Sequence, residues 1–202
     1  MVLPIVVYGD PVLRKTGEEI NENYPELGKL INDMFDTMYS AKGVGLAAPQ
    51  VGKAIRLFIV DTKPFTDTDE DDEDEEEEFT PEQKKQLKAF KRVFINARML
   101  NETGEEWAFN EGCLSIPKIR ENVNRLSNIE IEYYDEKFVK HVEKFDGVIA
   151  RVIQHEFDHI EGKLFTDKIS PFKRKMIAGK LSDISKGKIS ADYKTKVYKP
   201  KK

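Results

Sequence analysis

Residues 146–162 read DGVIARVIQHEFDHIEG, and the rest of the fold has to be built around this stretch. Asp146 is a residue type that begins helices, and Gly162 is one that ends them. Between them, steps of three and four residues place one set of side chains along a single helical face: Val148, Val152, His155 and His159. The sequence therefore predicts a helix whose core-facing stripe carries two histidines.

The pentapeptide His155-Glu156-Phe157-Asp158-His159 has the form H-E-x-x-H. Imidazoles four residues apart on a helix can reach one divalent metal ion. Glu156, about 100° round the helix from His155, is better placed to carry protons than to bind that ion. This pattern indicates a hydrolytic metal site. Two histidines on a helix can also pack or bond locally, and a catalytic site needs about three protein ligands.

The third ligand has two candidates. His141 lies among lysine and glutamate residues, which is typical of a solvated strand. Cys113 stands in EGCLSIP, residues 111–117, where glycine and proline define a short irregular backbone that could present a thiolate and free amides. A lone cysteine is also often a small buried hydrophobic residue.

A glycine-containing segment, GVGLAAPQ at residues 43–50, comes directly after a stretch with helical spacing of its apolar residues. Its last residue, Gln50, can donate an amide hydrogen bond to a developing oxyanion. Gly43 could equally serve only to end the preceding helix. A nucleotide-binding loop is excluded, because neither the third glycine of the dinucleotide fingerprint nor the Lys-Ser/Thr pair of a P-loop follows.

Taken in this order, GVGLAAPQ, EGCLSIP and QHEFDH resemble the three signature motifs of the peptide deformylases. The resemblance extends to residues 9–13 (GDPVL) and 162–165 (GKLF), and covers about residues 3–180 apart from one acidic insert. It implies an enzyme that removes the formyl group from the N-terminal methionine of newly made proteins. The expected partners are N-formyl-methionyl nascent peptides, with no DNA and no membrane.

The resemblance implies that Cys113, His155 and His159 hold the metal and that Glu156 is the general base and acid. It also implies iron(II) as the native ion, with zinc, nickel or cobalt able to replace it. The residue spacing does not choose among these ions. A thiolate ligand with two imidazoles differs in charge and softness from the ligand sets of ordinary H-E-x-x-H proteases.

The resemblance also implies the contacts of the substrate. Gln50 and the backbone amide of Leu114 would stabilise the oxyanion, and the Gly45 carbonyl would accept a hydrogen bond from the formyl-bearing nitrogen. Arg120 would contact the peptide. Four residues, with the His155 ring, are expected near the methionine side chain: Val44, Glu111, Val148 and Val152. Arg151 departs from the family pattern, because some members have an apolar pocket residue there.

Two alternatives use the same helix. One is a zinc-type metallopeptidase, which the deformylase-type surroundings of Cys113 and Gln50 disfavour. The other is a metal-stabilised binding module, which would need a fourth ligand and would not need Glu156. Replacing Glu156 by glutamine separates a hydrolase from a structural site.

The composition agrees with a single enzyme domain. The chain has 202 residues, of which 39% are hydrophobic and 35% charged, enough for one sizeable core. No apolar run is long enough to span a membrane, and residues 2–8 are too short for a secretory signal. One cysteine excludes an internal disulfide and suits a reducing cytoplasm, where we expect the protein.

The expected fold class is α+β, with mixed or antiparallel sheets packed around the central metal-binding helix and with N- and C-terminal helices. Apolar spacing predicts a helix over residues 27–38. Short strands are predicted at residues 57–60 and 93–96. A strand with one solvent-exposed face is predicted over residues 129–133.

We expect a catalytic domain over residues 1–185. Its insert at residues 67–78 holds eleven acidic residues in twelve positions and should remain solvated. The insert contributes −11 to a net charge of −4, so the remainder carries +7. Residues 186–202 form a lysine-rich C-terminal tail with seven lysines and one acidic residue. A solvated tail is one interpretation, and contact with ribosomal RNA is the other.

Overall fold

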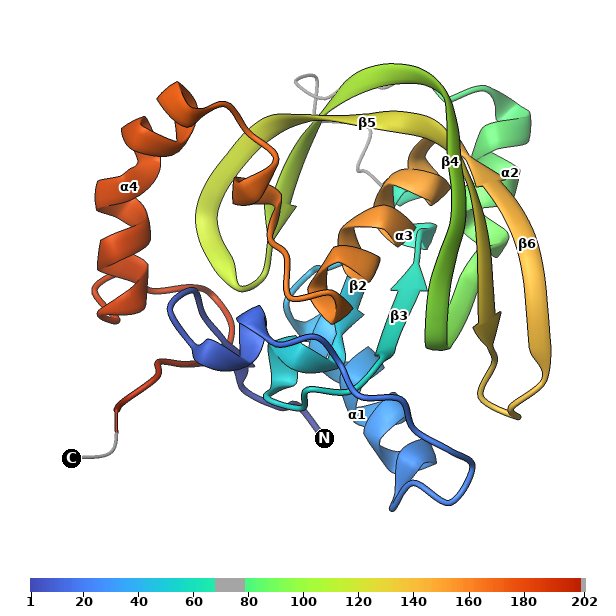
Figure 1. Cartoon of the computed structure of the whole chain (residues 1–202), viewed down its shortest axis with the longest axis horizontal. Helices are drawn as coiled ribbons and strands as arrows, with labels where there is room; N and C mark the ends of the chain where they lie inside the picture. Colours follow the sequence, from blue (N-terminus) through green and yellow to red (C-terminus); the bar gives the residue numbers. More distant parts are fainter. Residues whose placement is uncertain (68–78, 201–202) are drawn as a thin grey trace.

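The computed structural model describes residues 1–67 and 79–200. Its elements form a five-stranded antiparallel sheet, a separate parallel pair of short strands and four α-helices, which confirms the α+β prediction (Figure 1). The sheet order is β2 (Gly45–Ala47), β3 (Leu57–Asp61), β4 (Lys91–Cys113), β5 (Ile116–Tyr134) and β6 (Lys140–Asp146). The parallel pair is β1 (Ile5–Val6) with β7 (Thr195–Lys196).

The helices are α1 (Leu27–Ser40), α2 (Pro81–Ala89), α3 (Gly147–Ile160) and α4 (Pro171–Ser185). α3 is the predicted histidine helix, and it lies in the middle of the molecule with the sheet around it (Figure 1). Its apolar face packs on one side of the sheet, in a cluster with Phe58, Phe94 and Tyr133. Within residues 1–67 and 79–200, no helix has the length and apolar character needed to cross a membrane.

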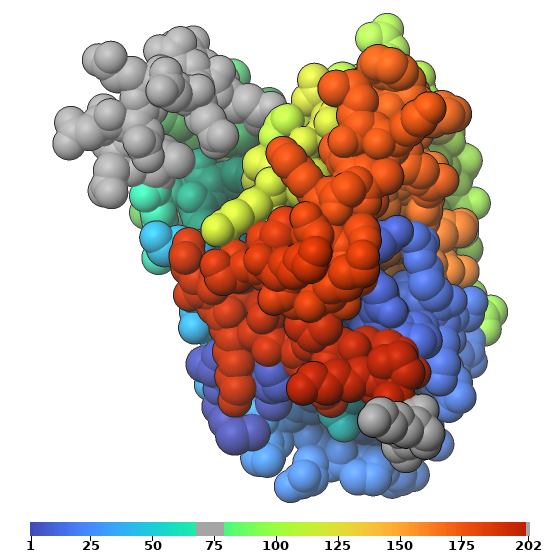
Figure 2. Space-filling view, turned by 90° about the vertical axis from the view of Figure 1, so that its left-hand side faces the viewer, coloured from blue at the N-terminus to red at the C-terminus, as the bar shows by residue number. Residues whose placement is uncertain are grey.

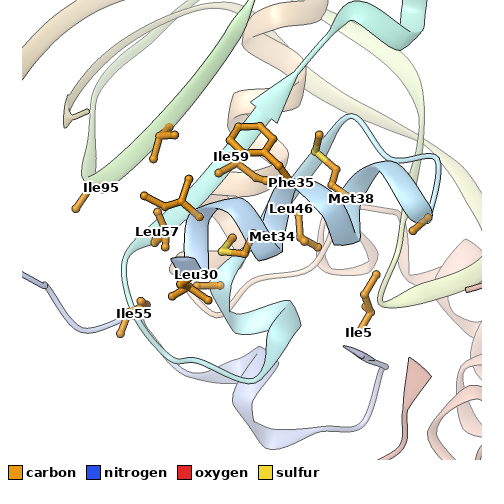
Figure 3. Packing of buried hydrophobic residues seen from close by; sticks show 14 residues of the cluster. Ile5, Leu30, Met34, Phe35, Met38, Leu46, Ile55, Leu57, Ile59 and Ile95 are labelled. Carbon is orange, nitrogen blue, oxygen red and sulfur yellow. The ribbon is translucent and has the colours of Figure 1, made fainter. Parts of the chain in front are cut away.

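The predicted helix at residues 27–38 is confirmed as α1. Its apolar stripe, which includes Met34 and Met38, packs against Leu57 and Ile59 of β3 (Figure 3). Both methionine side chains are fully buried, so this stripe belongs to the core. α1 leads directly into the segment 43–50, and its packing therefore fixes where that segment begins.

The predicted strand at residues 93–96 is only a small part of β4, which has 23 residues. The longer strand has no sequence signal because residues 100–106 are all exposed and show no alternation. Pairing with β5 stabilises them, with register shifts at four places along the ribbon. The ribbon brings Cys113, the last residue of β4, back toward α3.

One further expectation, for His141, is confirmed, and another, for the acidic insert, is not tested. His141 lies on β6, where Nε2 is 2.9 Å from Oδ2 of Asp135, and it takes no part in the histidine and cysteine cluster. All of the acidic insert except Asp67 falls outside the described residues.

The interpretation of residues 186–202 as a solvated tail is wrong for the part between residues 189 and 197. Half-buried residues alternate there with exposed ones, and Ile189, Tyr193 and Val197 pack against the two adjoining core clusters. The backbone pairs with β1. A signal existed in the sequence, because the packed residues stand at every second position, but the lysines and other polar residues between them drew the interpretation toward a solvated tail.

Candidate metal centre and active site

α3 and the end of β4 bring together the three predicted metal ligands. One nitrogen each of His155 and His159 and the sulfur of Cys113 all lie within 4.8 Å of one another. Sγ of Cys113 is 3.3 Å from Nε2 of His159. Helical spacing places the two imidazoles on one face, and the β4–β5 hairpin supplies the sulfur.

These donors fit a divalent transition-metal ion. A cysteine sulfur and two imidazole nitrogens are three protein ligands, the number typical of a catalytic site that keeps a position for water. Nδ1 of His155 faces Glu111, so its Nε2 is the atom left for an ion. Burial lowers the pKa of His159 well below its usual value, and the ring is therefore a neutral imidazole with a lone pair to donate.

Glu111 is the centre of a buried network behind the histidine ligand. Its Oε1 accepts hydrogen bonds from Nε of Arg125 at 2.7 Å and from Nη1 of Arg151 at 3.0 Å. Its Oε2 lies 2.9 Å from both Nη2 of Arg125 and Nδ1 of His155. Burial alone would raise the pKa of Glu111, but hydrogen bonds from His155 and Arg125 hold it well below its usual value. The carboxylate is therefore charged and orients the His155 ring.

Arg125 and Asp158 are two members of this network that the sequence analysis missed. Nη1 of Arg125 donates to Oδ2 of Asp158 at 2.6 Å, and both side chains are almost fully buried. A signal existed in the sequence, because Arg125 and the buried Val123 are two residues apart on β5 and share a face. That alternation places a charge in the core, where it needs a partner.

Glu156 is buried beside the three ligands, and burial raises its pKa to about 7. Its Oε2 makes no hydrogen bond within residues 1–67 and 79–200. A carboxyl group with a pKa near neutrality can both accept and return a proton. Gly45 makes room for this side chain, because a Cβ atom there would lie 2.7 Å from Cγ of Glu156.

Gln50 is held in one orientation. Its Oε1 accepts a hydrogen bond from the backbone amide of Ala47 at 2.8 Å. The amide nitrogen therefore points the other way, 3.5 Å from Sγ of Cys113 and 3.3 Å from Oγ of Ser115. The neighbouring Leu114 lies in the turn between β4 and β5, and its side chain packs close to Gly43. Gln50 and the Leu114 turn, from two separate segments, thus flank the cysteine.

A cavity of about 410 Å³ opens beside these groups. Most of the predicted site residues line it: Val44, Gly45, Gln50, Glu111, Cys113, Leu114, Arg120, Val152, His155 and Glu156. His159 lies behind it, next to the cysteine sulfur. Arg120 is exposed, and its guanidinium donates to the side chain and the backbone carbonyl of Asn110 at 2.7 Å.

Val148 is not among the lining residues. It lines a separate hollow with Trp107 and Asn128, because the cavity borders α3 one turn nearer to the histidines. Arg151 lines the cavity at that point, with its guanidinium 4.5 Å from the centre of the Trp107 ring. Phe65 and Phe109 also line it, and the sequence analysis did not select them.

Comparisons with known proteins agree with this geometry. Residues 2–175 match the model of the polypeptide deformylase family. The chain is 58% identical over 202 residues to the peptide deformylase of Flavobacterium psychrophilum, with both chains covered completely. It is 47% identical to the peptide deformylase of Cytophaga hutchinsonii, over 97% of each chain.

Solved structures give the same result. The crystal structure of a peptide deformylase from Legionella pneumophila matches with a TM-score of 0.74 and 34% identity, over 93% of this chain and 98% of that one. The peptide deformylase from Thermus thermophilus matches with a TM-score of 0.76 and 33% identity, over 93% and 99%. These relationships decide against the metallopeptidase and binding-module alternatives. The chain belongs to the polypeptide deformylase family, the metal-dependent hydrolases that remove N-formyl groups from nascent peptides.

Proposed function

We propose that the cavity beside Cys113 is where the chain releases formate from N-terminal formyl-methionine. The observation that carries this proposal is the convergence of Cys113, His155 and His159 beside a cavity that is also lined by the buried Glu156. The three residues would hold a divalent ion. When bound, such an ion supplies a water of lowered pKa and a Lewis acid for the formyl oxygen.

Glu156 moves the proton in this scheme. Its Oε2 takes a proton from the attacking water and returns it to the departing amine nitrogen, which is a poor leaving group until it is protonated. The pKa of about 7 that burial produces suits a group that must both accept and donate near neutral pH. Gly45 keeps this carboxylate close to the cavity, since a larger residue would displace it.

The oxyanion that develops on the formyl oxygen, as the formyl carbon becomes tetrahedral, is stabilised by the Nε2 group of Gln50 and the backbone amide of Leu114. Gln50 is suited to this because the Ala47 amide fixes its orientation before substrate arrives. The Gly45 carbonyl accepts a hydrogen bond from the formyl-bearing nitrogen. The methionine side chain contacts Val44 and Val152, and Arg120 contacts the peptide at the rim.

The experiment compares formate release from a formyl-methionyl peptide with release from its acetylated twin, by protein loaded with iron(II) without oxygen. We expect rapid release from the formyl peptide alone. Glu156→Gln should lower kcat by about 100-fold or more while metal binding is retained. The control is Glu136→Gln, at an exposed position after β5, which should behave like the wild type. Absence of release from wild-type protein holding one metal per chain would overturn the proposal.

We propose iron(II) as the native ion, which a soft thiolate ligand accommodates as well as zinc. An iron-thiolate pair open to the cavity should be sensitive to oxygen. Protein isolated without oxygen should therefore contain iron and lose activity on exposure to air, whereas zinc-loaded protein should keep in air whatever activity it has. Equal turnover and equal air stability of the two forms would contradict this assignment.

We also propose a cytoplasmic location and contact between the C-terminal tail and the ribosome. Alternation along the tail places Lys188, Lys194 and Lys196 on its exposed side, where they can neutralise RNA phosphates. Replacing these three lysines by glutamine leaves the packed side of the tail intact. The triple variant should cosediment with ribosomes more weakly than the wild type, and its cosedimentation should depend less on salt concentration. Unchanged cosedimentation would exclude the tail as the contact.

A further inference from the structure

The C-terminal tail lies along the body of the protein and reaches the segment that carries Cys113. Figure 2 shows the red part of the chain, before residue 201, spread over the surface beside the blue N-terminal part. Backbone hydrogen bonds join the two, from the Ile5 amide to the Lys194 carbonyl at 2.9 Å and from the Val7 amide to the Lys196 carbonyl at 3.2 Å. This pairing fixes the position of Tyr193, one residue earlier.

The Tyr193 hydroxyl donates a hydrogen bond to the backbone carbonyl of Leu114 at 2.7 Å. The ring is half-buried against the core cluster of α1 and β3, so the side chain is held at both ends. Burial raises the pKa of Tyr193 well above its ordinary value, and the hydroxyl therefore remains a donor at any working pH. The contact joins residues 79 positions apart in the sequence.

Other contacts hold the same turn from different directions. The Tyr8 amide donates to the Ser115 carbonyl at 2.8 Å, and Nε2 of Gln50 lies 3.3 Å from Oγ of Ser115. Two peptide planes meet at the Cα atom of Leu114: one carries its amide and the other its carbonyl. Fixing the carbonyl plane limits rotation at that atom, and so limits the directions in which the amide can point.

We propose that Tyr193 is a positioning residue for catalysis, which holds the Leu114 turn so that its amide is aimed at the developing oxyanion. This inference rests on the proposed function. An oxyanion donor is effective because its direction is set before the reaction, and no reorganisation is needed as charge appears. The tail from residue 189 to residue 197 then supports the active site, although it lies beyond the expected catalytic domain of residues 1–185.

The test compares Tyr193→Phe with Tyr198→Phe in the full-length, metal-loaded protein. The first variant removes one hydroxyl and keeps the packed ring; the second removes a hydroxyl from an exposed ring of the same tail. For Tyr193→Phe we expect kcat to fall about three- to tenfold, the worth of one lost hydrogen bond, with little change in KM. Binding of the deformylated product peptide should be unchanged, because it has no formyl oxygen. Tyr198→Phe should match the wild type.

A second measurement does not depend on turnover. Hydrogen exchange at the Leu114 and Ser115 amides should be faster in Tyr193→Phe than in Tyr198→Phe, while exchange in β4 and β5 remains the same. If the wild-type protein is active and Tyr193→Phe has the same kcat, the positioning role is overturned, even if the variant has a lower melting temperature. Absence of wild-type turnover would count against the proposed function instead.

Discussion

Nδ1 of His155 lies 2.9 Å from Oε2 of Glu111, whose other oxygen accepts hydrogen bonds from Arg125 and Arg151. A single buried carboxylate therefore links a proposed metal ligand to two arginines from different elements. This arrangement fixes the direction of the imidazole before any ion binds. The strength of the metal site should consequently depend on residues that never touch the ion.

Glu111→Gln tests this dependence. The amide keeps the size of the side chain but loses the charge and places N–H groups against other donors. Metal affinity should fall by about 10- to 100-fold, as is typical when a partner of a ligating histidine is lost. Competition with a chelator measures this affinity. The control is Glu121→Gln, on β5 in an ion pair with Lys173. Equal affinities for the two variants would contradict the role of Glu111.

Gly45→Ala should impair the proton carrier without removing a functional group. The new Cβ would lie 2.7 Å from Cγ of Glu156, closer than real contacts allow, so the carboxylate has to move. A displacement of this kind should lower kcat by about 100-fold while metal content stays the same.

The matched control for Gly45→Ala is Gly28→Ala, in the first turn of α1 with nothing within 4 Å of the added atom. That change should leave kcat unaltered and raise the free energy of unfolding by up to about 1 kcal/mol, since alanine favours a helix. Denaturant titration measures the free energy. Normal turnover in Gly45→Ala would show that Glu156 tolerates the displacement.

Arg151→Met should relax the choice of substrate side chain. The guanidinium of Arg151 forms part of the cavity wall and lies against the rings of Trp107 and Phe109, at 4.5 and 5.8 Å from their centres. A methionine side chain is flexible, so this part of the cavity wall could adjust to substrate side chains of different shape. The ratio of kcat/KM for formyl-methionyl and formyl-phenylalanyl peptides should fall about tenfold, within the range that apolar pockets achieve.

The control for Arg151→Met is Arg56→Met. Arg56 is also buried and lies 5.9 Å from the centre of the Phe157 ring, but it is outside the cavity lining. Its loss should lower stability and leave the ratio of kcat/KM values unchanged. The same change in both variants would indicate a general loosening of the structure.

Asp167 should make folding stability sensitive to acid. Burial alone would raise its pKa, but hydrogen bonds from Arg14 and from the Leu164 amide hold it below the ordinary value of 3.8. The unfolded chain then binds the proton more readily. The stabilisation is present above the unfolded pKa and is lost as the pH falls through the folded pKa. Thermal melts of Asp167→Asn should show lower stability at pH 7 and a smaller loss between about pH 5 and about pH 3. Equal slopes would contradict this.

Local pattern indicated a metal site on the histidine helix, and the resemblance to a known family supplied the other expected site residues. The four-residue step places His155 and His159 on one side of α3 whatever surrounds it, because the helical repeat is a property of the backbone. The same periodicity predicted α1. Cys113 and Gln50 were identified through the motifs that contain them, and the structure places both beside the histidines.

What the sequence by itself determined is therefore a set of reactive groups and the helix that presents two of them. Only the tertiary structure decided how those groups are supported: by Glu111 with Arg125 and Arg151, and by Tyr193 at the Leu114 turn. It also decided that the cavity borders Arg151 rather than Val148. The physical reason is the distance along the sequence over which each kind of interaction acts. Periodicity acts over a few neighbouring residues, whereas these contacts join residues 14 to 79 positions apart, and their partners depend on how strands and chain ends pack.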